Sequence, residues 1–190
     1  MPRYDISDFP RRSHIDIAHE AAITAYGKAG TWLDSITRVK ILEEVRSAKD
    51  CPLCLEQRRS LSPYTKEGEH VSQTGLDPIT VEIVHRLCNN ADRLTYRWFE
   101  SILAKGVPAE QYVEIVGLVA TAIIIDGFTG ALDHQTIPSP RAQGGVPTRK
   151  ANDKVVEAGA WIPIMEVKNE ETETGLPKIP NIFRAMGLVP

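Results

Sequence analysis

Two cysteines separated by two residues are the clearest candidates for chemistry in this chain. Cys51 and Cys54 lie in the stretch 50–58, which reads DCPLCLEQR. Side chains three positions apart on a helix share one face, so the two sulfurs can form a disulfide or share a metal ion. Pro52 fits the first turn of a helix, where its missing N–H is not needed. The free N–H groups of that turn carry partial positive charge, which favours the thiolate, the reactive form of cysteine.

Redox chemistry is the function that this pair favours, and a structural zinc site or two ordinary core residues are the alternatives. A zinc site needs two more ligands, for which His70, His85 and Cys88 are available. Structural zinc sites usually draw on two closely spaced ligand pairs. His70 and His85 come from separate segments, so the ligand set Cys51, Cys54, His70 and His85 remains an alternative; no metal or other cofactor is expected.

Acidic and histidine side chains elsewhere in the chain could serve the thiols. Glu43 and Glu44 precede Cys51 by one to two turns, where a carboxylate could relay protons. The alternative is a solvated acidic pair. His70 lies in a polar loop that could fold over the thiols, or could leave the ring in solvent. His85 lies within an apolar helical pattern, as a site acid/base or as a buried side chain with a satisfied hydrogen bond.

The remaining histidines and the third cysteine have simpler interpretations. We expect His14 and His19 to be surface or helix-end residues, and Cys88 to be a buried thiol without a chemical role.

Apolar residues at helical spacing predict six helices before a proline-rich tail. The predicted ranges are 14–29, 32–48, about 51–61, 78–89, 92–105 and 107–132. Asp77 followed by Pro78 is typical of a helix start, and Ser35 or Thr37 could assist the start of the second helix. Residues 115–125 are apolar on all sides, which indicates a helix buried in the core or at a subunit interface. No strand pattern is convincing, so the predicted class is all-α.

The chain divides by composition near residue 132. We predict a helical domain at 1–132 with its core at 30–132, and an irregular extension at 133–190 that packs on the body or on a neighbouring subunit. Seven of the 13 prolines lie in 138–190, and residues 170–173 form an acidic run. Residues 161–164 could anchor this extension, 181–188 could form a short helix, and 1–13 form an arm.

Composition excludes several classes of protein. The 190 residues carry a formal net charge of −3, which gives no electrostatic case for nucleic acid. Three cysteines do not make a secreted disulfide framework. The N-terminus lacks the apolar segment of a signal peptide, and the run 115–125 is shorter than the about 20 residues that span a bilayer. We expect a cytoplasmic protein without membrane partners, where a CxxC pair is more often catalytic or metal-binding than structural.

The order of these features resembles a known family. A helix that ends before C-P-x-C, a second helix begun by the cysteines, and a G-V-P-A-E-Q turn at 106–111 leading to a long apolar helix are similar to the alkylhydroperoxidase D (AhpD) and carboxymuconolactone decarboxylase superfamily. The resemblance covers about residues 30–132. Residues 181–190 also resemble a segment that precedes the catalytic core in peroxidase-related members of this superfamily, so a further domain or a partner chain could follow residue 190.

The resemblance implies an all-helical, homo-oligomeric protein that reduces a small peroxide with its two thiols. One thiolate attacks the peroxide, the other resolves the sulfenic acid to a disulfide, and a dithiol reductant restores the pair. Carried over from the family, Cys54 attacks and Cys51 resolves. The helix-terminus argument instead favours Cys51 as the thiolate, and the sequence does not decide between them.

The chain departs from the family pattern at two positions. The peroxidase motif has a glutamate twelve residues before the first cysteine and a histidine four residues after the second. This chain has Val39 and Arg58 there, and arginine cannot act as a general base. Glu43 or Glu44 could replace the acid, His70 or His85 could replace the base, and Arg58 could stabilise a thiolate.

Two other functions remain open. One is a non-catalytic binding or assembly module that keeps the pair for a structural disulfide or a metal. The other is a different enzyme on the same scaffold, with a small-molecule pocket lined by His85, Arg86 and Tyr96.

Overall fold

A computed structural model describes residues 13–167 and 179–189 of the chain. The fold is all-α, as the sequence predicts, with one small two-stranded sheet in the described part. The α-helices are α1 (Ser13–Tyr26), α2 (Ser35–Ala48), α3 (Pro52–Arg59), α4 (Pro78–Asn90), α5 (Tyr96–Ala104), α6 (Ala109–Ala131) and α7 (Asn181–Met186). The strands are β1 (Val155–Val156) and β2 (Ile164–Met165), and short 3-10 turns lie at Pro63–Thr65 and Ala91–Arg93.

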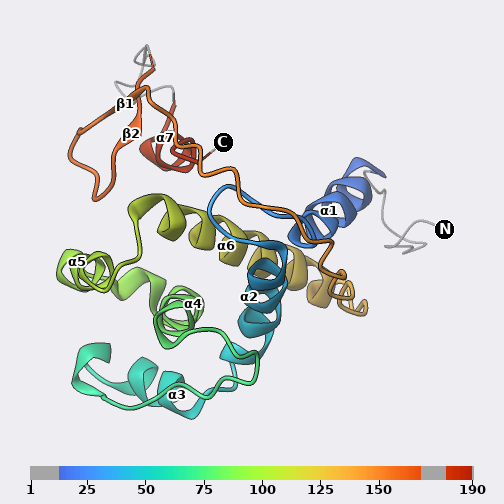
Figure 1. Cartoon of the computed structure of the whole chain (residues 1–190). Helices are drawn as coiled ribbons and strands as arrows, with labels where there is room; N and C mark the ends of the chain where they lie inside the picture. The colour runs from blue at the N-terminus through green and yellow to red at the C-terminus, as the bar shows by residue number, and fades with distance from the viewer. Residues whose placement is uncertain (1–12, 168–178, 190) are drawn as a thin grey trace, which may run out of the picture.

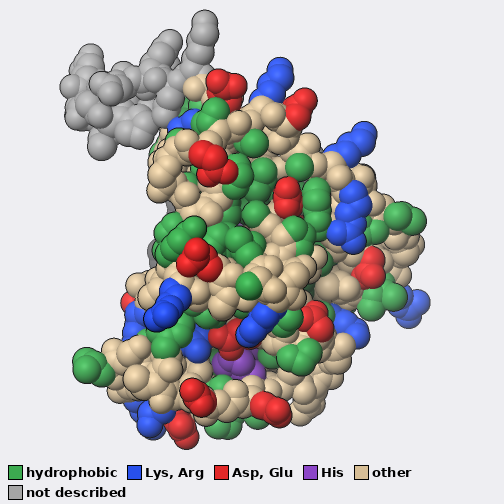
Figure 2. Space-filling view, turned by 60° about the vertical axis from the view of Figure 1, so that its left-hand side comes forward, with side chains coloured by type: hydrophobic (Ala, Val, Ile, Leu, Met, Phe, Trp, Pro, Cys, Tyr) green, Lys and Arg blue, Asp and Glu red, His purple; other side chains and the backbone are tan. Residues whose placement is uncertain are grey.

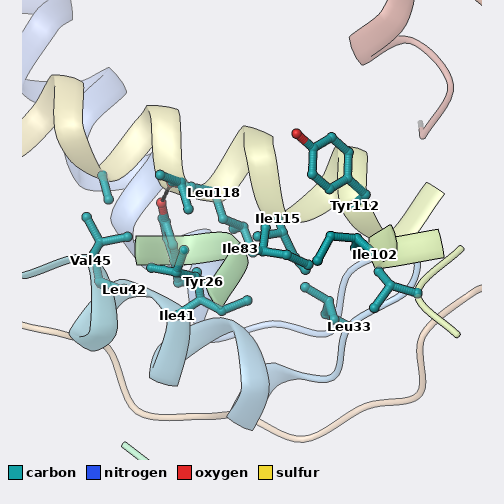
Figure 3. Close-up of a cluster of buried hydrophobic side chains, with 14 of the residues drawn as sticks. Tyr26, Leu33, Ile41, Leu42, Val45, Ile83, Ile102, Tyr112, Ile115 and Leu118 are labelled. Carbon is teal, nitrogen blue, oxygen red and sulfur yellow. Dashed lines mark hydrogen bonds between the residues drawn. The ribbon is translucent and has the colours of Figure 1, made fainter. Parts of the chain in front are cut away.

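Helices α2, α4 and α6 pack on one another and form the centre of the molecule (Figure 1). Ile41 and Leu42 of α2, Ile83 of α4 and Ile115 of α6 are fully buried where these helices meet (Figure 3). Each such side chain contributes about 1.5–3 kcal/mol when it leaves water. This core fixes the two helices, α2 and α4, that carry acidic and histidine side chains toward the cysteines.

Helix α6 is less completely buried than its all-round apolar sequence predicts. Ile115, Val119 and Ala122 are buried, but Ile123 and Ile124 are 44% and 64% exposed. By length and composition alone the helix could cross a membrane, a property that core helices of soluble proteins share. Its packing against α2 and α4 accounts for the apolar residues on its inner face.

Capping residues explain where the helices depart from the predicted bounds. Helix α2 begins at Ser35 rather than at 32, because the Asp34 carboxylate accepts a hydrogen bond from Thr37 N at 2.7 Å. Helix α5 begins at Tyr96 rather than at 92, because Thr95 caps it. These side chains satisfy backbone N–H groups that have no partner within the helix. The predicted α1 and α3 were also too long at their C-terminal ends, by three and about two residues.

The extension after α6 contains strands that the sequence analysis missed. Strands β1 and β2 are antiparallel and pair Val155 with Met165 and Val156 with Ile164. Two-residue strands are too short to show alternation, so no periodic signal marks them. The predicted short helix at 181–188 is present as α7 and ends at Met186.

Part of the extension runs back along the loop between α1 and α2 (Figure 1). Gln143 N donates to Gly27 O at 2.7 Å, and Arg149 N donates to Thr31 O at 2.8 Å. Further along, the Trp161 ring stacks on Phe99 of α5, with ring centroids 6.0 Å apart. The predicted arm at 1–13 falls almost entirely outside the described residues, as does the acidic run at 170–173.

Candidate functional site

The cysteine pair lies at the N-terminus of α3. Cys51 is the N-cap residue, Pro52 occupies the first helical turn, and Cys54 lies one turn along. Both thiols are free and buried, with exposed fractions of 2% for Cys51 and 0% for Cys54. The chain folds this way locally because proline is pre-organised for a first helical turn and lacks only an N–H that the helix does not use.

Two histidines from different segments direct the same ring nitrogen at the sulfurs. His70 lies in the loop between the 3-10 turn and α4, and its Nδ1 is 3.5 Å from Cys51 Sγ and 3.4 Å from Cys54 Sγ. His85 projects from α4, and its Nδ1 is 3.2 Å from Cys54 Sγ. The two imidazole rings lie 4.3 Å apart, centroid to centroid. The loop therefore folds back over the thiols, and the solvated alternative for His70 is wrong.

Each histidine is held by a carboxylate on its far side. His85 Nε2 is 2.7 Å from Glu44 Oε1 of α2, and both side chains are fully buried. His70 Nε2 is 2.8 Å from Glu82 Oε2 of α4. When a ring donates its Nε2–H to a carboxylate, its Nδ1 lone pair is free to face the sulfurs.

The two carboxylates are themselves fixed by further hydrogen bonds. Ser72 Oγ donates to Glu44 Oε2 at 2.6 Å, and Thr74 Oγ1 donates to the same oxygen. Arg86 Nε and Trp98 Nε1 both donate to Glu82 Oε1, at 2.8 and 3.1 Å. Buried carboxylates keep their charge when such donors replace lost water. Glu44 is accordingly a buried partner of His85, and the predicted solvated acidic pair is wrong for this residue.

The surroundings of the two thiols shift their pKa values in opposite directions. Burial opposes ionisation of Cys51, but the backbone N–H of Cys54 and the His70 ring outweigh it, so the pKa of the Cys51 thiol is lowered. Burial and the neighbouring Cys51 charge raise the pKa of Cys54. Of the two thiols, Cys51 is therefore the one whose ionisation is favoured, and Cys54 the one whose protonated form is favoured.

The histidines and glutamates complete this charge pattern. Burial lowers the pKa of His70, but its bonds to Glu82 and Cys51 outweigh that effect and raise it. Burial lowers the pKa of His85, so this ring is the neutral acceptor for the Cys54 S–H. Burial would raise the pKa of Glu82, yet bonds to His70 and Arg86 lower it to about 2. The pKa shifts therefore run in the direction that favours a thiolate and an imidazolium at Cys51 and His70, and a thiol and a neutral base at Cys54 and His85.

The same four side chains form a potential metal-binding group. One ligand atom from each of Cys51, Cys54, His70 and His85 lies within 4.8 Å of all the others. Two sulfurs and two imidazole nitrogens make the donor set of a structural zinc site. The cluster that sequence analysis left as an alternative is thus assembled by the fold.

A cavity reaches the cluster from the side of Cys51. Its volume is about 420 Å³. The lining residues are Glu43, Ser47, Asp50, Cys51, Val71, Gln73 and Thr74. Cys54 is not among these residues, so the cavity gives a small molecule a route toward the Cys51 sulfur first.

Arg58 and Cys88 do not join the cluster. The Arg58 side chain is exposed on α3, and no contact between it and either thiol is found in the described ranges. The arginine near the thiols is Arg86, which lies over the Tyr64 ring at 4.8 Å. Cys88 is half-buried on α4 and lines a different cavity. Tyr96 packs against Phe99 and Trp161. Among the main cavities of the described residues, none is lined by Tyr96 together with His85 or Arg86.

Sequence reasoning missed Glu82, which orients His70. The only available signal was its position on α4, three residues before His85 and four before Arg86, where the side chains of one helix face are neighbours. Two of the other three histidines were given simpler interpretations: His14 is exposed, and His19 has its ring against Phe128.

The outer surface near α3 is mixed in charge. On the face drawn in Figure 2, histidine reaches the surface low in the view, between acidic and basic side chains. Charges of both signs surround it there.

Comparisons with protein-family models, with curated proteins and with solved structures gave no match for this chain.

Proposed function

We propose that the protein is a dithiol oxidoreductase that reduces a small hydroperoxide with Cys51 and Cys54, in the manner of the AhpD-like proteins that its sequence resembles. The observation that carries the proposal is the buried chain Glu44–His85–Cys54, with contacts of 2.7 and 3.2 Å. This chain of contacts places a carboxylate and a histidine beside a thiol. It does so although Val39 and Arg58 occupy the positions where the family has its glutamate and histidine.

Cys51 is the attacking residue in this proposal. Cys51 is the N-cap residue of α3 and lines the cavity, and its sulfur lies 3.5 Å from His70 Nδ1. The thiolate attacks one peroxide oxygen, the O–O bond breaks, and Cys51 becomes a sulfenic acid. The departing alkoxide takes a proton from the His70 imidazolium and leaves as the alcohol.

Cys54 then resolves the sulfenic acid. His85 accepts the Cys54 proton, and the charge that develops on the ring is stabilised by Glu44. The Cys54 thiolate attacks the Cys51 sulfur, the S–O bond breaks, and the hydroxide leaves as water with a proton from His85. A dithiol reductant supplies two electrons and two protons to restore the pair.

This assignment differs from the one that the resemblance alone implies. There Cys54 attacks, whereas the cavity and the helix N-terminus both favour Cys51. Exposed apolar side chains on α6, including Ile123 and Ile124, support the accompanying proposal of a homo-oligomer.

Peroxide consumption in the presence of a dithiol tests the proposal. Cys51→Ser and Cys54→Ser should each abolish turnover, and Cys88→Ser should retain it. Cys54→Ser should also accumulate a sulfenic acid at position 51, which a sulfenic-acid-specific carbon nucleophile would trap for mass spectrometry. Unchanged turnover in both cysteine variants would exclude the proposed function, and a sulfenic acid that forms at Cys54 in Cys51→Ser at the wild-type rate would reverse the assigned roles.

A further inference from the structure

The two thiols and the two histidines beside them are spaced as a closed metal site requires in the contacts between sulfur and nitrogen. In a tetrahedral zinc site with Zn–S distances of about 2.3 Å and Zn–N distances of about 2.0–2.1 Å, neighbouring ligand atoms lie roughly 3.3–3.8 Å apart. The His70 Nδ1 contacts of 3.5 and 3.4 Å to the two sulfurs match that spacing, and the His85 Nδ1 contact of 3.2 Å is just below it. All four ligand atoms lie within 4.8 Å of one another.

The outer hydrogen bonds prepare both histidines as metal ligands. Glu82 and Glu44 each accept from an Nε2, and both Nδ1 atoms face the sulfurs. Once His70 releases its Nδ1 proton, both Nδ1 lone pairs can bind a metal ion. Carboxylate–histidine pairs of this kind fix the ring orientation and raise the basicity of the ligating nitrogen. An isolated acid–base relay needs only one such pair. Here there are two: His70 contacts both sulfurs, and His85 contacts the sulfur of Cys54.

Charge and burial also favour a soft divalent cation. Two thiolates would neutralise the two charges of the ion, and two neutral imidazoles would complete four-coordination. Sulfur and imidazole ligands in a tetrahedral arrangement select zinc rather than magnesium or calcium, which prefer oxygen. The side chain of His70 is 5% exposed, and His85 and Cys54 are fully buried, so four protein ligands would leave no position for water.

We propose that Cys51, Cys54, His70 and His85 bind one Zn²⁺ ion, and that the bound ion holds the cysteine pair in a reduced form that does not turn over peroxide. The regulatory half of this proposal rests on the proposed peroxidase function, and the metal-binding half does not. With zinc bound, both sulfurs and both histidine Nδ1 atoms are occupied by the ion. Neither the thiolate of Cys51 nor the base at His85 is then available for the reaction.

Zinc binding is measured directly on the full chain, freed of metal by a chelator under reducing conditions. Titration with Zn²⁺ against a chromophoric chelator should give one site per chain, and Co²⁺ should give the absorption of a tetrahedral thiolate complex. Cys54→Ser and His70→Ala should abolish the stoichiometric site. Cys88→Ser and His19→Ala, which change the same residue types outside the cluster, should retain it.

A variant that changes no proposed ligand separates loss of the metal site from loss of folding. Glu82→Gln keeps the size of the side chain but removes the charge behind His70, and should weaken zinc affinity by roughly 10–100-fold. Its helical circular dichroism should match that of the wild type. Unchanged affinity in this variant would overturn the role given to Glu82 in orienting His70.

Peroxide consumption by the metal-free and zinc-loaded protein separates the two proposals. Fast turnover without metal and at least tenfold slower turnover with one equivalent of zinc would support both. Absence of stoichiometric zinc binding in a protein that consumes peroxide would overturn the metal site and leave the function standing. One tightly bound zinc in a protein whose metal-free thiols ignore peroxide would overturn the peroxidase function and the regulation, and would support metal binding alone.

Discussion

At the scale of single residues, the two sulfurs differ because their imidazole partners differ. His70 sits between Cys51 and Glu82, and the latter also binds Arg86 and the Trp98 indole. His85 lies with Glu44 in a fully buried pair. These partners favour a thiolate at Cys51 and a protonated thiol at Cys54, and on that basis we propose that Cys51 attacks and Cys54 resolves.

Glu44→Gln should slow resolution more than attack. The amide keeps contacts to Ser72 and Thr74 but cannot stabilise positive charge on His85. We expect disulfide formation to slow by roughly 100-fold, a typical contribution of acid–base catalysis. Rapid-quench thiol labelling after one equivalent of hydroperoxide measures both steps.

Glu100→Gln, on the exposed side of α5, is the matched control and should leave both steps unchanged. Equal slowing of attack and resolution in Glu44→Gln would contradict the role given to the Glu44–His85 pair.

Cys88 should resist alkylation at neutral pH. Burial, and then the charge of Glu44, raise the pKa of its thiol to about 12. Only the thiolate is nucleophilic, and at pH 8 about one such thiol in 10⁴ is ionised, against roughly one in four for an ordinary cysteine of pKa 8.5. Labelling should accelerate about tenfold per pH unit up to pH 11 in the folded protein, as peptide mass spectrometry would record. Labelling of Cys88 at pH 8 as fast as a model thiol would contradict this.

At the scale of elements, the site depends on three segments meeting at one point: the first turn of α3, the loop that carries His70, and the middle of α4. Helix α4 is set by its N-cap, where Asp77 accepts from the N–H groups of Ile79 and Thr80 at 3.1 and 3.0 Å. Pro78 follows at the first helical position. This N-terminus sets the rotation of α4 about its axis, so that the face with Glu82 and His85 points toward the cysteines.

Asp77→Ala should destabilise the protein by about 1 kcal/mol, because two backbone N–H groups lose their acceptor. Asp77→Asn should retain most of the stability, since asparagine caps helices about as well. Urea denaturation followed by circular dichroism gives both values. An alanine variant as stable as the wild type would show that the cap contributes nothing to holding α4.

The sequence predicted the helices of the site better than the loop. Glu44 and His85 could be proposed because they fall on strongly periodic helices near the cysteines. His70 lies in a loop whose sequence has no periodicity, so no local pattern predicts where the loop places this side chain. Arg58 was proposed because a family motif put a functional residue at its position, yet the chain supplies its histidines from other segments.

In the rest of the fold too, periodic helices were predicted, and features set by capping or long-range packing were missed. Six helices were predicted from apolar spacing, and their ends were missed where a cap such as Asp34 or Thr95 decides them. The β1–β2 pair was missed because its two-residue strands are fixed by long-range packing of the extension, with Ile164 fully buried.

At the scale of the whole molecule, Glu114 of α6 ties the core to the loop between α1 and α2. Its carboxylate accepts from the N–H groups of Trp32 and Leu33 at 2.6 and 3.2 Å and forms an ion pair with Arg38 of α2. A Cβ on Gly30 would overlap both charged groups of this ion pair. A side chain at this position would therefore displace the charged ends of Glu114 and Arg38.

Gly30→Ala should destabilise the protein by about 1–3 kcal/mol, because the Glu114 carboxylate must move away from its donors. Gly127→Ala is the matched control on the exposed side of α6, where an added Cβ meets nothing within 4 Å. This second change should stabilise the helix by up to about 1 kcal/mol. Denaturation midpoints of the two variants should move in opposite directions; a shared direction would contradict the account of this loop.

The central claim is that Cys51 and Cys54 form a reactive pair. The most direct test treats metal-free Cys88→Ser protein with one equivalent of an organic hydroperoxide and then measures its intact mass and its number of free thiols. We predict rapid loss of both thiols and of two hydrogen atoms in mass, reversed by a dithiol. Both thiols remaining intact in the folded, metal-free protein would contradict the central claim.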